Sequence, residues 1–147
     1  MTEKPKILIV DDDQTIRTSL SIILQEEGYD VDTAETGKEA IEKSNSKIYN
    51  VALLDFRLPD IEGTKLLTLM KDTVPKMRKI MLTGYPSMTN AVDSVNFGAD
   101  AFLVKPCETS EVLAKIEEQL KKQKEDSQFS QLRVAEYIET QFKTSIA

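Results

Sequence analysis

Five short apolar segments recur along the chain, and the residues that follow them constrain the fold more than any other feature. ILIV leads into Asp11, Asp12 and Asp13, VALL into Asp55, IML into Thr83 and FLV into Lys105, whereas the segment near Val31 leads into no such group. Segments of this length are too short for buried helices, and their Ile and Val content is typical of buried strands. If the strands are parallel, their carboxyl ends lie along one edge of a sheet, where the sites of open α/β folds form. The polar residues are therefore expected to meet at that edge.

Helical patterns separate these apolar segments. We expect strands at 6–10, 30–34, 51–54, 79–82 and 101–104, and helices at 14–27, 37–46, 63–73, 88–97 and 109–124. Strands that alternate with helices of this size indicate βαβ units, in which right-handed crossovers join parallel strands. The predicted fold class is α/β, a doubly wound five-stranded parallel sheet with helices on both faces.

The composition narrows the classes of partner and compartment. The 147 residues carry a net charge of −6, which argues against direct binding to nucleic acid or to an anionic membrane. Cys107 is the only cysteine and there is no histidine, so neither an internal disulfide nor a Cys/His zinc site is possible. The N-terminal residues lack the apolar stretch of a signal peptide, and no segment approaches the length of a membrane span. We expect a cytoplasmic protein.

The last part of the chain differs in composition from the rest. After Leu120 comes the polar stretch KKQKEDSQ, which suits either a solvated helix or a linker. Apolar residues then follow at helical spacing, namely Phe129, Leu132, Ala135, Ile138 and Phe142. This stripe predicts an extra C-terminal helix that docks back on its own domain, begins a longer segment, or contacts a partner or a second copy of the chain.

The acid cluster suggests a cation site. Three consecutive carboxylates, Asp11, Asp12 and Asp13, repel one another, and a magnesium ion would relieve the repulsion because Mg²⁺ prefers oxygen ligands. Side chains of neighbouring residues in an extended chain point to opposite faces, so the three cannot all coordinate equally. Asp13 is better suited to cap the helix that follows.

The other strand-end residues suit phosphoryl chemistry. A carboxylate such as Asp55 acts as a nucleophile towards phosphorus, and an adjacent cation neutralises the charge of the transferred group. The Thr83 hydroxyl can donate a hydrogen bond to a phosphoryl oxygen, and the Lys105 ammonium can pair with the phosphate or with a carboxylate.

In this order and spacing, the segments ILIVDDD, LLDFRLPDIEG, MLTG and FLVKP resemble the receiver domain of bacterial and archaeal two-component response regulators. The resemblance covers residues 5 to about 122. It implies a flavodoxin-like fold with strand order 2-1-3-4-5. It also implies that residues 1–124 form the receiver domain and that 125–147 are a helical extension for dimerisation or partner contact, or a truncated linker.

The resemblance further implies roles for individual residues. Asp55 matches the phosphoacceptor, which takes a phosphoryl group from the phosphohistidine of a sensor histidine kinase or phosphotransfer protein. Mg²⁺ is expected to be bound directly by Asp12, partly through water by Asp11, and by Asp55 and the backbone carbonyl of Arg57. Such a domain is a signalling module, with self-phosphorylation and slow autodephosphorylation as its only reactions.

The same resemblance implies a switch. Thr83 matches the switch hydroxyl, Phe102 the aromatic ring that moves inward with it, and Lys105 the lysine that pairs with the phosphate. The surface that responds would lie near 84–104, and a downstream protein would bind there. Its apolar residues Met88, Ala91, Val92 and Val95 are expected to lie on the output face.

Three other functions fit parts of the pattern. A phosphohydrolase of the haloacid-dehalogenase type also uses a nucleophilic Asp, but it needs a second acid where this chain has Arg57. A flavin or nucleotide binder on this fold needs a glycine-rich phosphate loop, whereas acids follow the first strand here. A receiver that is not phosphorylated is disfavoured because all five site residues are present, namely Asp11, Asp12, Asp55, Thr83 and Lys105.

Overall fold

The computed structural model describes residues 3–70, 72–84, 92, 93 and 95–146, with backbone only for 144–146. Five parallel strands form one sheet in the order β2-β1-β3-β4-β5. The strands are β1 (Lys6–Val10), β2 (Asp30–Ala34), β3 (Val51–Asp55), β4 (Arg78–Thr83) and β5 (Ala101–Val104). Both the fold class and the strand order predicted from the sequence are confirmed.

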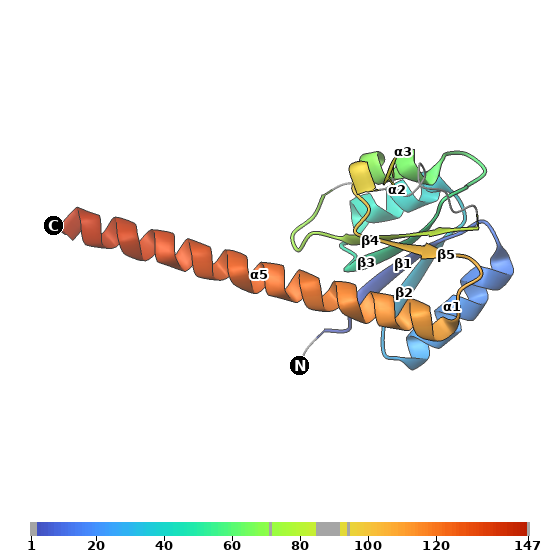
Figure 1. Ribbon diagram of the computed structural model, residues 1–147, viewed down its shortest axis with the longest axis horizontal. Coiled ribbons are helices and arrows are strands. Elements are labelled where there is room, and N and C mark those ends of the chain that lie inside the picture. The colour runs from blue at the N-terminus through green and yellow to red at the C-terminus, as the bar shows by residue number, and fades with distance from the viewer. Residues whose placement is uncertain (1–2, 71, 85–91, 94, 147) are drawn as a thin grey trace.

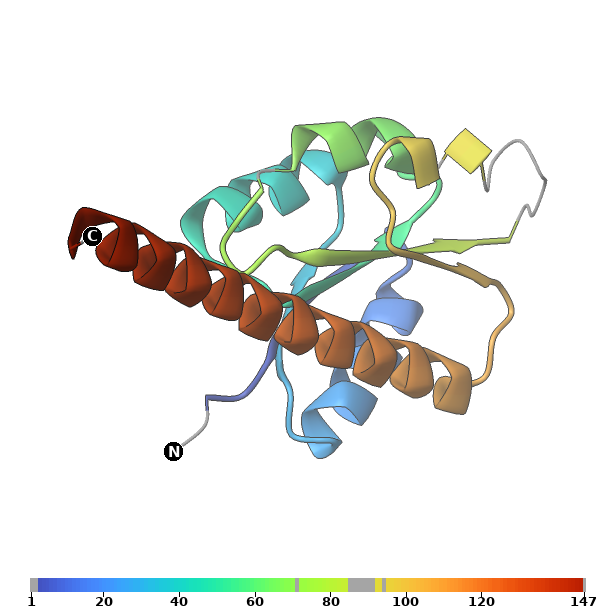
Figure 2. The same cartoon turned by 60° about the vertical axis from the view of Figure 1, so that its left-hand side comes forward.

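Helices cover both faces of the sheet (Figures 1 and 2). They are α1 (Gln14–Glu26), α2 (Gly37–Ser46), α3 (Gly63–Leu69) and α5 (Thr109–Ile146). Helices α1 and α5 contact each other on one face, and α2 and α3 contact each other on the opposite face. Because strand side chains alternate, the sheet contributes to two separate apolar cores. One core contains Leu8, Leu54 and Met81, and the other contains Ile9, Leu53 and Leu82.

The ends of the first two helices follow from single residues. The Asp13 side chain accepts a hydrogen bond from the Ile16 N–H at 3.1 Å, so Asp13 is the N-cap of α1, as the sequence predicted. Gly28 has a φ of +93° and follows the end of the helix, in the left-handed region that glycine adopts without strain. Thr36 caps α2 by accepting from the Glu39 N–H at 3.2 Å.

Two of the predicted helices have bounds that the structure changes or does not describe. The helix predicted at 63–73 ends at Leu69, because Met70 has an extended backbone and buries its side chain in the core. The predicted helix at 88–97 lies largely outside the described residues, together with Met88 and Ala91 of the expected output face. Of that face, Val92 and Val95 are described and exposed.

Helix α5 is continuous over 38 residues and projects far beyond the sheet (Figure 1). Apolar residues such as Ile116 pack the first turns of α5 against the core. A polar network then holds the turns that follow. The buried Gln119 accepts from Arg78 Nε at 3.0 Å, and Gln123 donates to the Asn50 carbonyl at 3.0 Å. One turn later, Asp126 pairs with Arg78 at 3.2 Å.

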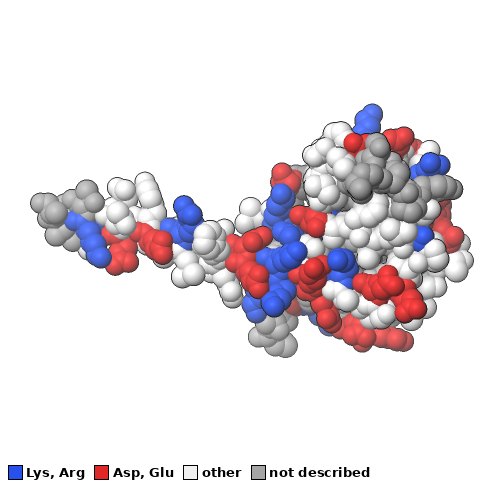
Figure 3. Space-filling view, in the orientation of Figure 1, with Lys and Arg blue, Asp and Glu red and all other residues white. Residues whose placement is uncertain are grey.

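From Gln128 to Lys143 the helix is exposed. Its large apolar residues keep 58–66% of their surface accessible, namely Phe129, Leu132, Val134, Tyr137, Ile138 and Phe142. Figure 3 shows uncharged surface along this extension, interrupted by charged side chains of both signs. The alternative in which the segment docks back on its own domain is therefore wrong for the described residues. No helix in the described part of the chain is long and apolar enough to cross a membrane.

Candidate functional site

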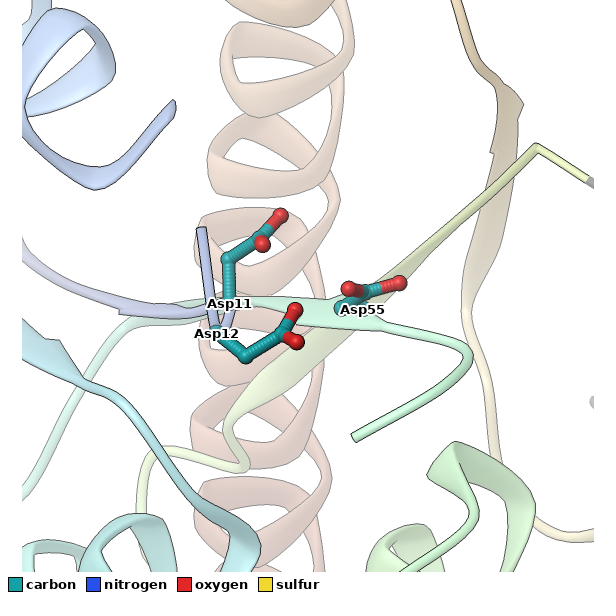
Figure 4. A group of neighbouring side chains, drawn as sticks. All are labelled: Asp11, Asp12 and Asp55. Atoms are coloured by element: carbon teal, nitrogen blue, oxygen red, sulfur yellow. The ribbon is translucent and has the colours of Figure 1, made fainter. Parts of the chain in front are cut away.

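Three carboxylates converge at the carboxyl ends of β1 and β3, as the strand-end pattern predicted. Oxygen atoms of Asp11, Asp12 and Asp55 all lie within 4.8 Å of one another. Figure 4 shows that Asp11 and Asp12 extend from one chain segment and Asp55 from the end of the neighbouring strand. Asp11 is buried, Asp55 is partly buried and Asp12 is exposed. Solvent therefore reaches the group at Asp12, whereas Asp11 is enclosed.

Lys105 joins this cluster from the end of β5. Its Nζ lies 2.9 Å from Asp11 Oδ2 and 3.5 Å from Asp55 Oδ1. Its backbone N–H donates to the Thr83 carbonyl at 2.6 Å, which fixes the lysine beside the end of β4. Burial acts to lower the pKa of Lys105, but the hydrogen bond and charge of Asp11 and the charge of Asp55 outweigh it, so the pKa is raised. The ammonium is therefore held in its charged form.

The carboxyl group of Asp55 lies in an unfavourable setting for an anion. Burial raises its pKa first, and the charges of Asp11 and Asp12 add to the effect. Lys105 and a hydrogen bond from the Arg57 N–H, at 3.3 Å, act in the opposite direction without cancelling the shift. Binding of a cation would reduce the repulsion between these neighbouring negative charges.

The donor atoms of the cluster suit a hard divalent cation. All are carboxylate oxygens, the ligand type that Mg²⁺ and Ca²⁺ prefer. The main chain next to the acids is fixed: Arg17 donates to the Asp11 carbonyl at 2.8 Å, and the Asp13 N–H donates to Asp11 Oδ1 at 2.9 Å. Since Asp13 caps α1, it is not part of the converging group, which answers the question left by the three consecutive acids.

The loop that follows Asp55 closes tightly on itself. The Gly63 N–H donates to the Phe56 carbonyl at 2.7 Å, and Arg57 and Glu62 form an isolated antiparallel bridge. A Cβ atom on Gly63 would lie 2.8 Å from the Asp55 carbonyl oxygen, so glycine is required where the two chain segments pass. Arg57 therefore lies at the base of a closed loop, beside Asp55.

The remaining predicted residues lie on β4 and β5. Thr83 is the last residue of β4 and is 1% exposed, and Leu82 beside it pairs in register with Asp55. Phe102 pairs in register with Met81, is partly buried and packs against the core on the α2 and α3 face.

Sequence reasoning did not identify two residues that hold the site together. Arg17 lies in the first turn of α1, and its side chain donates a hydrogen bond to the backbone carbonyl of Asp11. Asp60 lies in the loop after Asp55 and accepts hydrogen bonds from the backbone of α2. Both act through backbone groups of other residues, six positions away for Arg17 and more than twenty for Asp60, and no residue pattern in the sequence marks such contacts.

Comparison with known proteins identifies the family of the chain. The response regulator receiver domain family matches residues 7–117. The response regulator ArlR of Staphylococcus saprophyticus is 36% identical over 120 residues, which are 80% of this chain and 53% of that protein. The chain spans about half the length of the curated relatives it matches.

Two solved structures extend the comparison. A CheY-like response regulator receiver domain protein from Methanospirillum hungatei is 45% identical with a TM-score of 0.81, over 84% of this chain and 99% of that one. A response regulator protein from Burkholderia pseudomallei, solved with a phosphorylated aspartic acid, a calcium ion and citrate, is 26% identical with a TM-score of 0.71. It is matched over 86% of this chain and 75% of its own. From its fold, its converging acids and these matches, the chain belongs to the response regulator receiver domain family of two-component signalling.

Proposed function

We propose that Asp55 is the residue that is phosphorylated. The single observation that carries this proposal is the convergence of Asp55 with two other acids and Lys105 at the carboxyl edge of the sheet. Among these acids, Asp55 is the one that ends a central strand and lies partly buried, and its Oδ1 atom lies 3.5 Å from Lys105 Nζ. Asp11 is already paired with the same lysine and is almost fully buried.

The cation at this site is proposed to be Mg²⁺, held by Asp12, by Asp11 partly through water, by Asp55 and by the backbone carbonyl of Arg57. When bound, such an ion neutralises part of the charge of the phosphoryl group and orients it. The structure of the Burkholderia pseudomallei relative, which contains a divalent cation and a phosphorylated aspartate, supports this proposal.

In the proposed reaction an oxygen of the Asp55 carboxylate attacks the phosphorus atom of a phosphohistidine. The new O–P bond forms as the N–P bond breaks, and the released imidazole keeps the bonding electron pair and takes up a proton. Lys105 pairs with the phosphoryl oxygens, for which it exchanges its contact with the carboxylate of Asp55. The phosphodonor is a sensor histidine kinase or a phosphotransfer protein.

Thr83 is proposed to be the switch hydroxyl that donates to a phosphoryl oxygen. A hydrogen bond to such a charged group contributes about 1.5–3 kcal/mol, enough to shift a two-state equilibrium by about tenfold to a hundredfold. Phe102 follows Thr83 by moving inward, and the surface near 84–104 changes with it. Phe102 already packs against the core on the α2 and α3 face of the sheet, and this contact supports its proposed movement with Thr83.

The output is proposed to run through protein contacts in the cytoplasm. A downstream protein binds the surface near 84–104, and the exposed apolar residues of the α5 extension form a second contact surface. A second copy of the chain is the first candidate for this surface, which would make the protein a homodimer.

The decisive experiment is intact-mass analysis after incubation with acetyl phosphate, with and without Mg²⁺. We expect a gain of one phosphoryl group that requires Mg²⁺ and is lost in Asp55→Asn. Asp30→Asn, an exposed acid at the start of β2, removes the same charge at the opposite edge of the sheet and should leave the gain unchanged. An adduct that persists in Asp55→Asn would refute the assignment of the acceptor.

A further inference from the structure

Asp60 connects the loop after β3 to the start of α2. Its Oδ1 atom accepts from the Gly37 N–H at 2.9 Å, and its Oδ2 atom accepts from the Lys38 N–H at 3.0 Å. These are the first two N–H groups of α2, which have no partner within the helix. Both hydrogen bonds lower the pKa of the Asp60 carboxyl group, so the anion is the form that makes the contact.

The contact between this loop and α2 is also close in space. A Cβ atom on Gly37 would lie 2.1 Å from the Cγ2 atom of Ile61, so only glycine allows the loop to pack this tightly. Ile61 itself packs against the core beneath α2 and α3. The loop is thus held at its tip by one carboxylate and by one apolar side chain next to it.

Both ends of this connection lead to proposed ligands. On one side, Asp60 belongs to the closed loop that Phe56 and Gly63 complete, and the loop begins at Asp55. On the other side, α2 begins three residues after Ala34, whose carbonyl accepts from the Asp11 N–H at 3.1 Å. The start of α2 is therefore linked to both chain segments that supply the acids, through Asp60 on one side and through the end of β2 on the other.

We infer that Asp60 is a positioning residue for the cation site: by binding the start of α2, it fixes the loop of Asp55 and Arg57 relative to the loop of Asp11 and Asp12. This inference rests on the proposed assignment of those residues as ligands. It deepens that proposal by adding a residue that touches neither the cation nor the phosphoryl group.

The test is the Mg²⁺ dissociation constant of the unphosphorylated full chain, measured by isothermal titration calorimetry and by amide chemical shifts of Phe56 and Arg57. In Asp60→Asn, an NH₂ donor faces an N–H donor of α2, and the loop loses one anchor. We expect the dissociation constant to rise about tenfold, the effect typical of losing a group that orients ligands. Gly37→Ala should weaken Mg²⁺ binding in the same direction, because its methyl group displaces Ile61.

Thr36→Ala is the matched control. It removes the other cap of the same helix, the hydrogen bond from the Glu39 N–H, while the contact with Asp60 remains. Its melting temperature should fall, as it should in Asp60→Asn, but its Mg²⁺ dissociation constant should stay at the wild-type value. A merely structural role for Asp60 predicts that the two variants bind Mg²⁺ equally.

The outcomes separate this inference from the proposed function. If the wild type binds Mg²⁺ and Asp60→Asn binds it as tightly, Asp60 has no positioning role. The same conclusion follows if Thr36→Ala loses affinity as much as Asp60→Asn does. If the wild type binds no Mg²⁺ at all, the proposed cation site is itself wrong, and the role of Asp60 with it.

Discussion

Removing the charge of Asp55 is expected to stabilise the folded chain when no divalent cation is present. The variant is Asp55→Asn, which keeps the shape of the side chain and an oxygen that can accept from the Arg57 N–H. In the wild type, burial and then the charges of two neighbouring acids raise the pKa of Asp55 despite the nearby Lys105. The ionised carboxylate is thus less favourable in the folded chain than in the unfolded one.

The size of the effect follows from the distances. At 4.8 Å, the limit within which the carboxylate oxygens lie, two carboxylates repel by about 0.9 kcal/mol at the dielectric constant of water and about 3.5 kcal/mol at an effective value of 20. Two such repulsions act on Asp55, and the attraction of Lys105 at 3.5 Å cancels somewhat more than one of them. A net gain of about 0.5–2 kcal/mol remains, or a rise in melting temperature of about 2–6 °C for a chain of this length.

The assay is thermal unfolding at pH 7 in EDTA, followed by far-UV circular dichroism. Asp13→Asn is the control, because it removes the same charge nearby while asparagine also caps a helix well. The folded pKa of Asp55 lies above its ordinary value of 3.8. The stability advantage of the variant should therefore disappear as the pH falls from the folded pKa to below 3.8, where the carboxyl group is protonated in both states. Mg²⁺ should then raise the melting temperature of the wild type more than that of Asp55→Asn. A variant less stable than the wild type in EDTA would refute the reasoning.

Three further predictions concern other parts of the chain. Lys79 is 5% exposed and its Nζ donates to the Leu67 carbonyl at 3.3 Å, so Lys79→Met should raise the free energy of unfolding by about 1 kcal/mol in urea titrations. Burial lowers the pKa of this lysine, so the gain should shrink as the pH rises towards 10.5, and a gain that grows would contradict the burial argument. Tyr49 donates to Asp32 at 2.6 Å and lowers the pKa of that carboxyl group, so Tyr49→Phe should cost about 1 kcal/mol at neutral pH and less once Asp32 is protonated in acid. If the α5 extension pairs with a second copy, light scattering should show a dimer that Ile138→Asp converts to a monomer; a wild-type monomer at high concentration would exclude this pairing.

The strand-end residues could be predicted from sequence because a parallel sheet aligns them. Short apolar segments define buried strands, the intervening helical patterns make the strands parallel, and the residues after the strands must then share one edge. Asp55, Thr83 and Lys105 lie there as expected. The capping role of Asp13 was also predictable, because it depends only on its immediate neighbours along the chain.

The course of α5 was not predictable in the same way. Its polar stretch after Leu120 suits a linker as well as a helix, and a pattern of apolar residues cannot distinguish the two. In the structure Gln119 and Gln123 are buried because Arg78 and Asn50 supply hydrogen bonds from the starts of distant strands. Burial of a polar side chain depends on such partners, and no periodicity in the sequence reveals them.

The contact made by Asp60 shows why the arrangement of a site is harder to predict than its membership. Asp60 and Gly37 are 23 residues apart, and their contact requires that a loop tip and the start of a helix meet. The need for glycine at position 37 arises from Ile61 and not from any turn in its own segment. Strand order determines which side chains approach the edge of the sheet, but contacts between loops determine their separation. Under the role proposed for Asp60, cation binding depends on that separation, and hence on a residue that binds no cation.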